Sequence, residues 1–199
     1  MLRKIINKGK IIINKENVLI TNEISEELEK QIINLDKESF TDPNDYWEEK
    51  KSFELFKQNK KIELAAINKE NNELMGYILF LVLTEEEYKQ IRIGNHLESD
   101  IEIKDVIAKN ELKENNTYSL YFSIIAIKPK YRQQKLGNIL IESINEEIEK
   151  YKKKNIFFSK LLSYVVSGGG YAASSKLGLK EVCKNIEGAT VMEMIIDTP

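Results

Sequence analysis

The residues best suited to chemistry lie in a basic turn, YRQQKLGN, at residues 131–138. Arg132 and Lys135 bring positive charge, and Gly137 lacks a Cβ, so a bulky anion can approach the backbone closely. The turn follows an apolar strand that ends at Pro129 and leads into a helix, whose first amides and positive dipole end favour an anion. This pattern predicts a site for a phosphate or pyrophosphate group.

The turn and the strand before it resemble motif A of the GNAT acetyltransferase superfamily, in which a hydrophobic strand ending V-x-P precedes x-x-R/Q-x-x-G-x-G/A. Ile127 and Pro129 match the strand end, and Arg132 and Gly137 match the first and last motif positions. Lys135 stands where the middle glycine belongs. An ordinary strand, turn and helix of another α/β protein is the alternative that this segment alone leaves open.

The resemblance implies how these residues would bind acetyl-CoA. Backbone groups of Ile125 and Ile127 would hold the pantetheine arm, and Arg132 would lie at the phosphates. The amides that would hold the pyrophosphate belong to Gln133, Gln134, Lys135, Leu136, Gly137 and Asn138.

A second segment, SGGGYAASSKLGLKEV at residues 167–182, resembles the motif B of the same superfamily, a helix with the consensus N-x-x-A-x-x-F-Y-E-K-L-G-F. Residues 176–179 reproduce its K-L-G-F ending, and Gly178 suits the left-handed residue that follows a helix. Ser167 falls where the consensus asparagine contacts the cofactor, and Ser174 falls where the tyrosine would be. Two motifs in the proper order indicate the family much more strongly than either alone.

Acetyl transfer to an amine also needs proton chemistry. In family members a carboxylate on the strand before the basic turn often acts as base through water, and the motif B tyrosine acts as acid. Here Ser123 and Ser174 occupy those positions, and neither hydroxyl does this chemistry unaided. Tyr171 lies almost one helical turn before Ser174, so its phenol is a candidate general acid, with a packing tyrosine as the alternative. A backbone N–H near the strand end would hold the oxyanion.

Composition excludes several other classes of function. Cys183 and His96 are the only residues of their types, which argues against a disulfide, a cysteine cluster or a multi-histidine metal site, so we expect no metal. The chain has 30 basic and 32 acidic side chains, and this near-neutrality does not favour nucleic acid. No apolar run is long enough to span a bilayer, and the amino terminus lacks a signal-peptide core. We expect a cytoplasmic protein, monomeric or homodimeric, with no membrane partner.

Apolar runs around the motifs predict the sheet that positions them. Residues 62–67 and 74–83 are joined by the asparagine-rich turn 68–73, which indicates an antiparallel hairpin. The second of these strands is nearly all apolar, so it should lie centrally, with Gly76 at a close backbone contact or bulge. Residues 157–166 predict a further strand, and residues 181–185 and 190–196 predict a closing hairpin.

The amino-terminal third is predicted by element order alone. Residues 10–14 and 17–21 read as a strand or small hairpin, and Ser25 caps a helix that runs to about Phe40. A second helix is expected to start at Asp42 and Pro43 and to place Tyr46, Phe53 and Phe56 on one face. Trp47 either packs in the core or lines a substrate pocket, and packing is the more common role.

Residues 84–116 form a long charged connection with a weak helix at residues 84–92. Such a connection is typical of a lid or a binding loop, so we interpret it as an insertion near the substrate site. Its acids, Glu98, Asp100, Glu102 and Asp105, would attract an amine, although a solvated excursion without a role in recognition is an equal alternative.

Together these observations predict one domain over residues 1–199, of the α/β (α+β) class. The resemblance implies a mixed, mostly antiparallel sheet of about six or seven strands, flanked by helices and splayed between the fourth and fifth strands. It further implies an N-acetyltransferase that moves the acetyl group of acetyl-CoA directly to a primary amine of a small molecule or protein. A non-catalytic acyl-CoA-binding sensor or interaction domain is the alternative.

Overall fold

The computed structural model describes residues 15–40 and 46–196, which contain both strands and helices. In chain order the elements are β1 (Val18–Thr21), α1 (Glu26–Ser39), α2 (Glu49–Lys57), β2 (Lys61–Asn68), β3 (Leu74–Leu83), α3 (Glu85–Arg92), β4 (Thr117–Ile127), α4 (Leu136–Lys152), β5 (Phe157–Val165), α5 (Gly168–Lys176), β6 (Lys180–Lys184) and β7 (Thr190–Ile195). Short 3-10 turns η3 (Glu98–Asp100), η4 (Ile103–Asp105) and η5 (Lys109–Glu111) lie between α3 and β4, and η6 (Pro129–Tyr131) precedes α4.

The strands form one seven-stranded sheet in the order β1-β2-β3-β4-β5-β7-β6. Neighbouring strands are antiparallel except β4 and β5, which are parallel. All ten residues of β3 are buried, as the apolar run from Leu74 to Leu83 predicts for a central strand. The mixed, mostly antiparallel sheet expected from the sequence is therefore confirmed.

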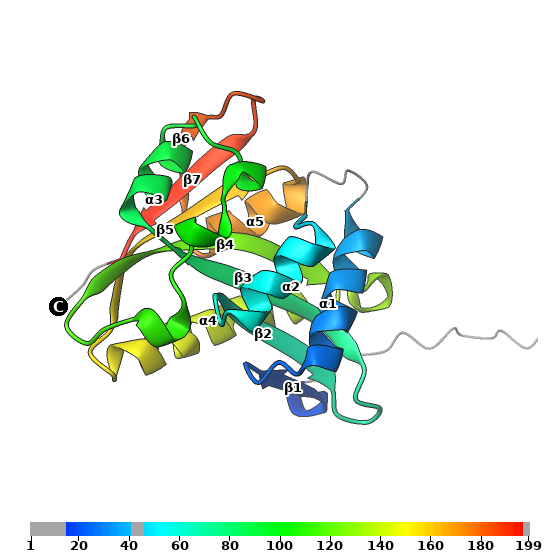
Figure 1. Ribbon diagram of the computed structural model, residues 1–199. Coiled ribbons are helices and arrows are strands. Elements are labelled where there is room, and N and C mark those ends of the chain that lie inside the picture. The colour runs from blue at the N-terminus through cyan, green and yellow to red at the C-terminus, as the bar shows by residue number, and fades with distance from the viewer. Residues whose placement is uncertain (1–14, 41–45, 197–199) are drawn as a thin grey trace, which may run out of the picture.

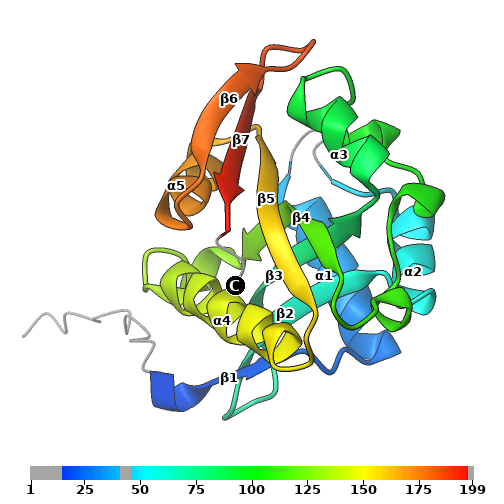
Figure 2. The same cartoon turned by 90° about the vertical axis from the view of Figure 1, so that its left-hand side faces the viewer.

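Helices cover both faces of the sheet, with α1, α2 and α3 on one side and α4 and α5 on the other (Figures 1 and 2). Each face has its own apolar core. Ile32, Leu55 and Tyr77 are fully buried on the first side, and Leu140 and Leu161 are fully buried on the second. Burying one such aliphatic side chain contributes about 1.5–3 kcal/mol, so packing on the sheet dominates the stability of these helices.

The sheet opens between β4 and β5, next to a bulge in β4. Register passes from Phe80 opposite Phe122 to Leu79 opposite Ile124, so Ser123 is the extra residue of the bulged strand. Pairing of β4 with β5 ends at Phe122 and Ser163. The last residues of β4 remain paired with β3, while β5 continues along β7. The predicted splay thus begins at the bulge.

Close backbone packing holds β3 against this part of β4. A Cβ added to Gly76 would lie 2.6 Å from the carbonyl oxygen of Ala126, so any side chain there would force the strands apart. Gly178, after α5, has a φ of 96°, which is the left-handed conformation expected for the glycine that ends this helix. Both glycines occupy positions that their sequence context predicts.

The amino-terminal elements agree only in part with the prediction. Ser25 caps α1 by accepting a hydrogen bond from the Leu28 amide, as expected. The strand or hairpin at residues 10–14 and the helix start at Asp42 and Pro43 lie outside the described residues. Where the structure resumes, α2 begins only at Glu49, so the expectation that Tyr46 lies within this helix is wrong. None of the described helices is long and apolar enough to cross a lipid bilayer.

Candidate active site

A cavity of about 540 Å³ lies in the splay and against the start of α4. We call it the outer cavity. It is lined by residues of β4, of the basic turn and of α5. These residues belong to two motifs that are distant in the sequence. Its lining includes six of the predicted cofactor-binding residues, namely Ile125, Ile127, Arg132, Gly137, Asn138 and Ser167.

The basic turn has two residues in the left-handed conformation. Gln133 has a φ of 59° and Lys135, the N-cap of α4, has a φ of 65°. Lys135 occupies the position at which the motif has its middle glycine, and glycine is the residue that adopts positive φ without strain. Lys135 therefore adopts the left-handed conformation that suits a glycine, and this conformation is strained for a residue with a Cβ.

Side chains also hold the turn in shape. Arg132 donates from Nε to the carbonyl of Ile127 at 2.9 Å, and Gln134 donates to the carbonyl of Lys130 at 2.7 Å. Leu136 is buried in the core beneath α4. Four of the predicted cofactor-binding residues do not line the outer cavity, namely Gln133, Gln134, Lys135 and Leu136. They instead shape the loop that leads into α4.

Glu73, in the turn between β2 and β3, anchors the start of the loop. Its carboxylate accepts hydrogen bonds from Lys130 at 2.6 Å, from Tyr131 at 2.9 Å and from Lys128 at 3.2 Å. The bond from Lys130 contributes most to holding the pKa of Glu73 down at about 2. The loop is therefore tied to the sheet at any pH near neutrality.

The other wall of the outer cavity is the amino-terminal half of α5. Ser167 caps this helix by accepting a hydrogen bond from the Gly170 amide at 3.0 Å. Gly169, Gly170 and Ala172 line the cavity, and their small size keeps it wide. Lys176 adds a positive charge to the lining.

A second, inner cavity of about 50 Å³ lies deeper in the splay and shares Phe40, Ile125, Ser167 and Gly170 with the outer one. It is lined by Phe40, Glu98, Phe122, Ser123, Ile124, Ile125, Ser163, Tyr164, Val165, Val166, Ser167, Gly170 and Ser174. Ser174 is fully buried and bonds to Ser163 at 3.3 Å, which in turn donates to the carbonyl of Phe122 at 3.1 Å. The predicted cofactor residue Ser174 therefore lies at this inner cavity.

Glu98 is the chemically distinctive residue of the inner cavity. Its carboxylate accepts one hydrogen bond from Ser123 and another, of 2.9 Å, from the phenol of Tyr121. The indole of Trp47 donates to Ser123 at 2.9 Å. Burial raises the pKa of the Glu98 carboxyl from its ordinary value of 4.5 to about 7, against the opposing effect of these donors.

Sequence reasoning had named Glu98 only as one of four acids that attract an amine. A carboxylate was sought on β4 itself, where Ser123 stands. One available signal was the pair Ile101 and Val106, apolar residues within an acidic segment, both of which are fully buried. They show that the segment returns to the core, and so carries neighbouring acids toward the sheet.

Tyr171 does not lie where a general acid is needed. Its side chain is 42% exposed, it donates to Glu181 at 2.9 Å, and it lines neither cavity. The hydrogen bond to Glu181 raises the pKa of the phenol, which makes it a weaker acid. This placement argues against a role of Tyr171 in proton transfer.

The remaining candidates for other chemistry lie apart. His96 contacts Glu87 at 3.0 Å, and Cys183 donates to the carbonyl of Arg92 at 3.3 Å. Within residues 15–40 and 46–196, His, Cys, Asp and Glu side chains form no group of three or more that would hold a metal ion.

Comparison with known proteins gives matches among solved structures only. No family model matches the sequence, and no curated protein sequence matches it. The ribosomal-protein-alanine N-acetyltransferase of Escherichia coli is similar at 15% identity with a TM-score of 0.56, covering 92% of this chain and 96% of that one. NAA60 of Arabidopsis thaliana, solved with acetyl-CoA, is similar at 11% identity with a TM-score of 0.61, covering 90% and 99%. An aminoglycoside 6'-N-acetyltransferase, solved with coenzyme A, is similar at 14% identity with a TM-score of 0.55, covering 92% and 98%.

Proposed function

Because the chain has the GNAT N-acetyltransferase fold, we propose that it transfers an acetyl group from acetyl-CoA directly to a primary amine. The observation that carries this proposal is the joining of two cavities in the splay. An outer cavity lined by the basic turn adjoins an inner cavity that contains the carboxyl group of Glu98. An acyl-CoA-binding domain without catalysis has no need of the inner carboxyl group.

The residues at the outer cavity fit an acyl-CoA. The edge of β4 that faces away from β3 offers the backbone groups of Ile125 and Ile127 to the pantetheine amides. Amides of residues 133–137, with Arg132 nearby, suit the pyrophosphate at the positive end of α4, whereas the Asn138 amide already donates to the Lys135 carbonyl at 2.9 Å. Gly137 lines the outer cavity, and an added Cβ there would be in ordinary van der Waals contact, at 3.5 Å, with the Ile127 side chain. When bound, the co-substrate supplies an acetyl thioester that an amine can attack.

The inner cavity limits what the acceptor can be. A volume of about 50 Å³ holds only a few non-hydrogen atoms. An unhindered primary amine fits this space, with the rest of the acceptor outside. The names of similar structures include both a protein and an aminoglycoside acceptor, so either class of amine is compatible with this fold.

The test combines binding and turnover. Calorimetry should show that acetyl-CoA binds the purified protein and raises its melting temperature. Release of the CoA thiol should then be followed with a panel of amines: a diamine, an aminoglycoside, a peptide with a free amino terminus and a lysine peptide. Thiol release with at least one amine supports the transferase, and binding without any release supports the sensor. Failure to bind acetyl-CoA contradicts both.

A further inference from the structure

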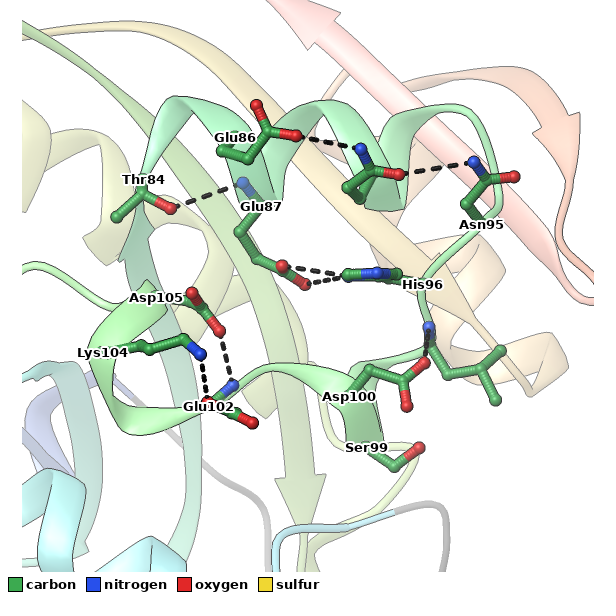
Figure 3. A network of polar contacts seen from close by, with 12 residues as sticks. Thr84, Glu86, Glu87, Asn95, His96, Ser99, Asp100, Glu102, Lys104 and Asp105 are labelled. Atoms are coloured by element: carbon green, nitrogen blue, oxygen red, sulfur yellow. Dashed lines mark hydrogen bonds and ion pairs between the residues drawn. The ribbon is translucent and has the colours of Figure 1, made fainter.

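The segment between β3 and β4 is braced so that η3 has a defined position. The Thr84 hydroxyl caps α3, Glu87 pairs with His96, and Asp100 and Asp105 accept hydrogen bonds from the backbone amides of Leu97 and Glu102 (Figure 3). These last two bonds measure 2.8 Å and 2.9 Å. They fix the turns on either side of Ile101, whose side chain is fully buried.

Contacts from α2 tie η3 to the rest of the protein. Lys51 donates to the carbonyl of Ser99 at 3.1 Å, and its ammonium group lies 4.7 Å from the ring centroid of Trp47. Trp47 itself is only 4% exposed. Through Ser99, Lys51 and Trp47 therefore hold η3 in place, and Glu98, the residue before Ser99, is held with it.

The hydrogen bonds around Glu98 have a definite direction. An indole N–H only donates, so the Ser123 oxygen must accept from Trp47 and its own proton must point toward Glu98. The phenol of Tyr121 donates to the second carboxylate oxygen. Ser123 and Tyr121 thus donate to one oxygen of Glu98 each, and Glu98 also lines the inner cavity, where a proton donor could reach it.

The charged and titratable groups around this carboxyl come from four elements. Lys51 of α2 lowers its pKa, and Tyr121 of β4 does so through its hydrogen bond. The charge of Glu98 contributes to raising the pKa of Asp36 of α1, and Tyr164 of β5 lines the same cavity. The pKa near 7 leaves a large ionised fraction at neutral pH, as a general base requires.

We infer that Glu98 is the catalytic base of the acetyl transfer, supplied by the segment between β3 and β4 instead of by β4 itself. The inference rests on the proposed function. The carboxylate takes one proton from the acceptor's ammonium group, and the neutral amine then forms the N–C bond to the acetyl carbon. The C–S bond breaks, a second proton of the amine nitrogen goes to the sulfur, and Glu98 returns its proton to solvent. Atoms and charges balance as acetyl amide, CoA thiol and one released proton.

Ser123 and Trp47 act as positioning residues in this scheme. Ser123 stands at the place where the motif resemblance implies a carboxylate, and it is the extra residue of the β4 bulge. Its hydroxyl holds a carboxylate oxygen of Glu98 at that same place. The departure from the motif is thereby explained, since the carboxylate is present but comes from another segment.

The test compares Glu98→Gln with a matched control, Glu114→Gln. Glu114 lies on the same segment between β3 and β4, but its side chain is exposed to solvent and lines neither cavity. We expect Glu98→Gln to lower kcat/KM by about 100-fold or more, while the Kd for acetyl-CoA stays within about twofold. Glu114→Gln should match the wild type in both. The wild-type profile of kcat/KM should rise with pH through a midpoint near 7, and Glu98→Gln should lose this limb.

A second measurement needs no acceptor. In protein labelled with ¹³C at glutamate carboxyl carbons, one signal absent from Glu98→Gln should titrate near pH 7. A midpoint close to 4.5, or turnover by Glu98→Gln equal to that of the wild type, overturns the inference while leaving the transferase intact. A wild type that binds acetyl-CoA but acetylates no amine overturns the transferase itself, and the inference with it.

Discussion

The indole nitrogen of Trp47 lies 2.9 Å from the hydroxyl oxygen of Ser123, although 76 residues separate them in the chain. This contact joins the segment before α2 to the bulge of β4 and orients the hydroxyl toward Glu98. Trp47 is a packed core residue that lines neither cavity, and it acts on the inner cavity only through its hydrogen bond to Ser123. Of the two roles that the sequence left as alternatives, the structure therefore favours packing.

Removing this hydroxyl should disturb Glu98 without removing it. Ser123→Ala deletes a donor that stabilises the ionised carboxylate, so the pKa of Glu98 should rise further above 7. The low-pH limb of kcat/KM should move to higher pH by about one unit, which equals about 1.4 kcal/mol. Ser143→Ala is the control, because that buried hydroxyl bonds only within α4. An unmoved limb in Ser123→Ala would argue against the orienting role.

Bulk and negative charge at Gly137 should weaken binding of the pyrophosphate. We expect Gly137→Glu to raise the Kd for acetyl-CoA at least tenfold, about 1.4 kcal/mol. Gly137→Ala is the steric control, since its Cβ would make ordinary contacts of 3.5 Å and 4.0 Å with Ile127 and Ile125. Calorimetry measures both. A folded Gly137→Glu variant with unchanged affinity would remove Gly137 from the site.

Lys135 offers a stability test of the turn. Because its φ of 65° is strained for a residue with a Cβ, Lys135→Gly should raise the free energy of unfolding by about 1 kcal/mol. Lys135→Ala removes the charge but keeps the Cβ, so it should show no such gain. Urea denaturation of the three proteins separates the two effects. Equal stability of the glycine and alanine variants would contradict a strained turn.

Stability should fall as pH rises from about 4.5 to about 7. Burial raises the folded-state pKa of Glu98 to about 7 and that of Asp36 to about 7, above ordinary values of 4.5 and 3.8. In this window the unfolded chain has released protons that the folded protein keeps, so their contribution is complete at lower pH and is lost on the way up. For Glu98 the loss is on the order of 3 kcal/mol. Denaturation of Glu98→Gln from pH 4 to pH 8 should show a shallower decline than the wild type.

Tyr171→Phe should leave turnover within about twofold of the wild type. The phenol bonds to Glu181 at the surface, and such exposed contacts contribute little. A large loss of kcat with unchanged acetyl-CoA affinity would return Tyr171 to the site.

Local signals predicted the frame of the site well. The apolar run before Pro129, the turn chemistry of residues 131–138 and the glycine after α5 are short-range features, and each one fixes its own backbone conformation. Two such motifs in order then determined the splay between β4 and β5. The lining of the outer cavity comes almost entirely from these segments.

The position of Glu98 at the inner cavity could not be predicted from local signals. Glu98 reaches Ser123 across 25 residues, and the segment between them has no periodicity that reveals which way its acids face. Its position depends on Trp47, Lys51 and Ile101, whose contacts are tertiary. Tyr171 shows the opposite error, since helical spacing alone placed it near Ser174 whereas the helix turns its phenol outward.

The different construction of the two cavities has a consequence for hydrogen exchange. The outer cavity is lined by β4, a strand of the central sheet, and by α4, which packs on the core. Glu98 instead belongs to short turns that are held by side-chain caps. Segments of the latter kind open at lower free energy than central strands. Amides near η3 should therefore exchange before those of β4. On the proposed function, each such opening would move Glu98 away from the inner cavity while the walls of the outer cavity stay in place, so acetyl-CoA binding would tolerate a motion that stops turnover.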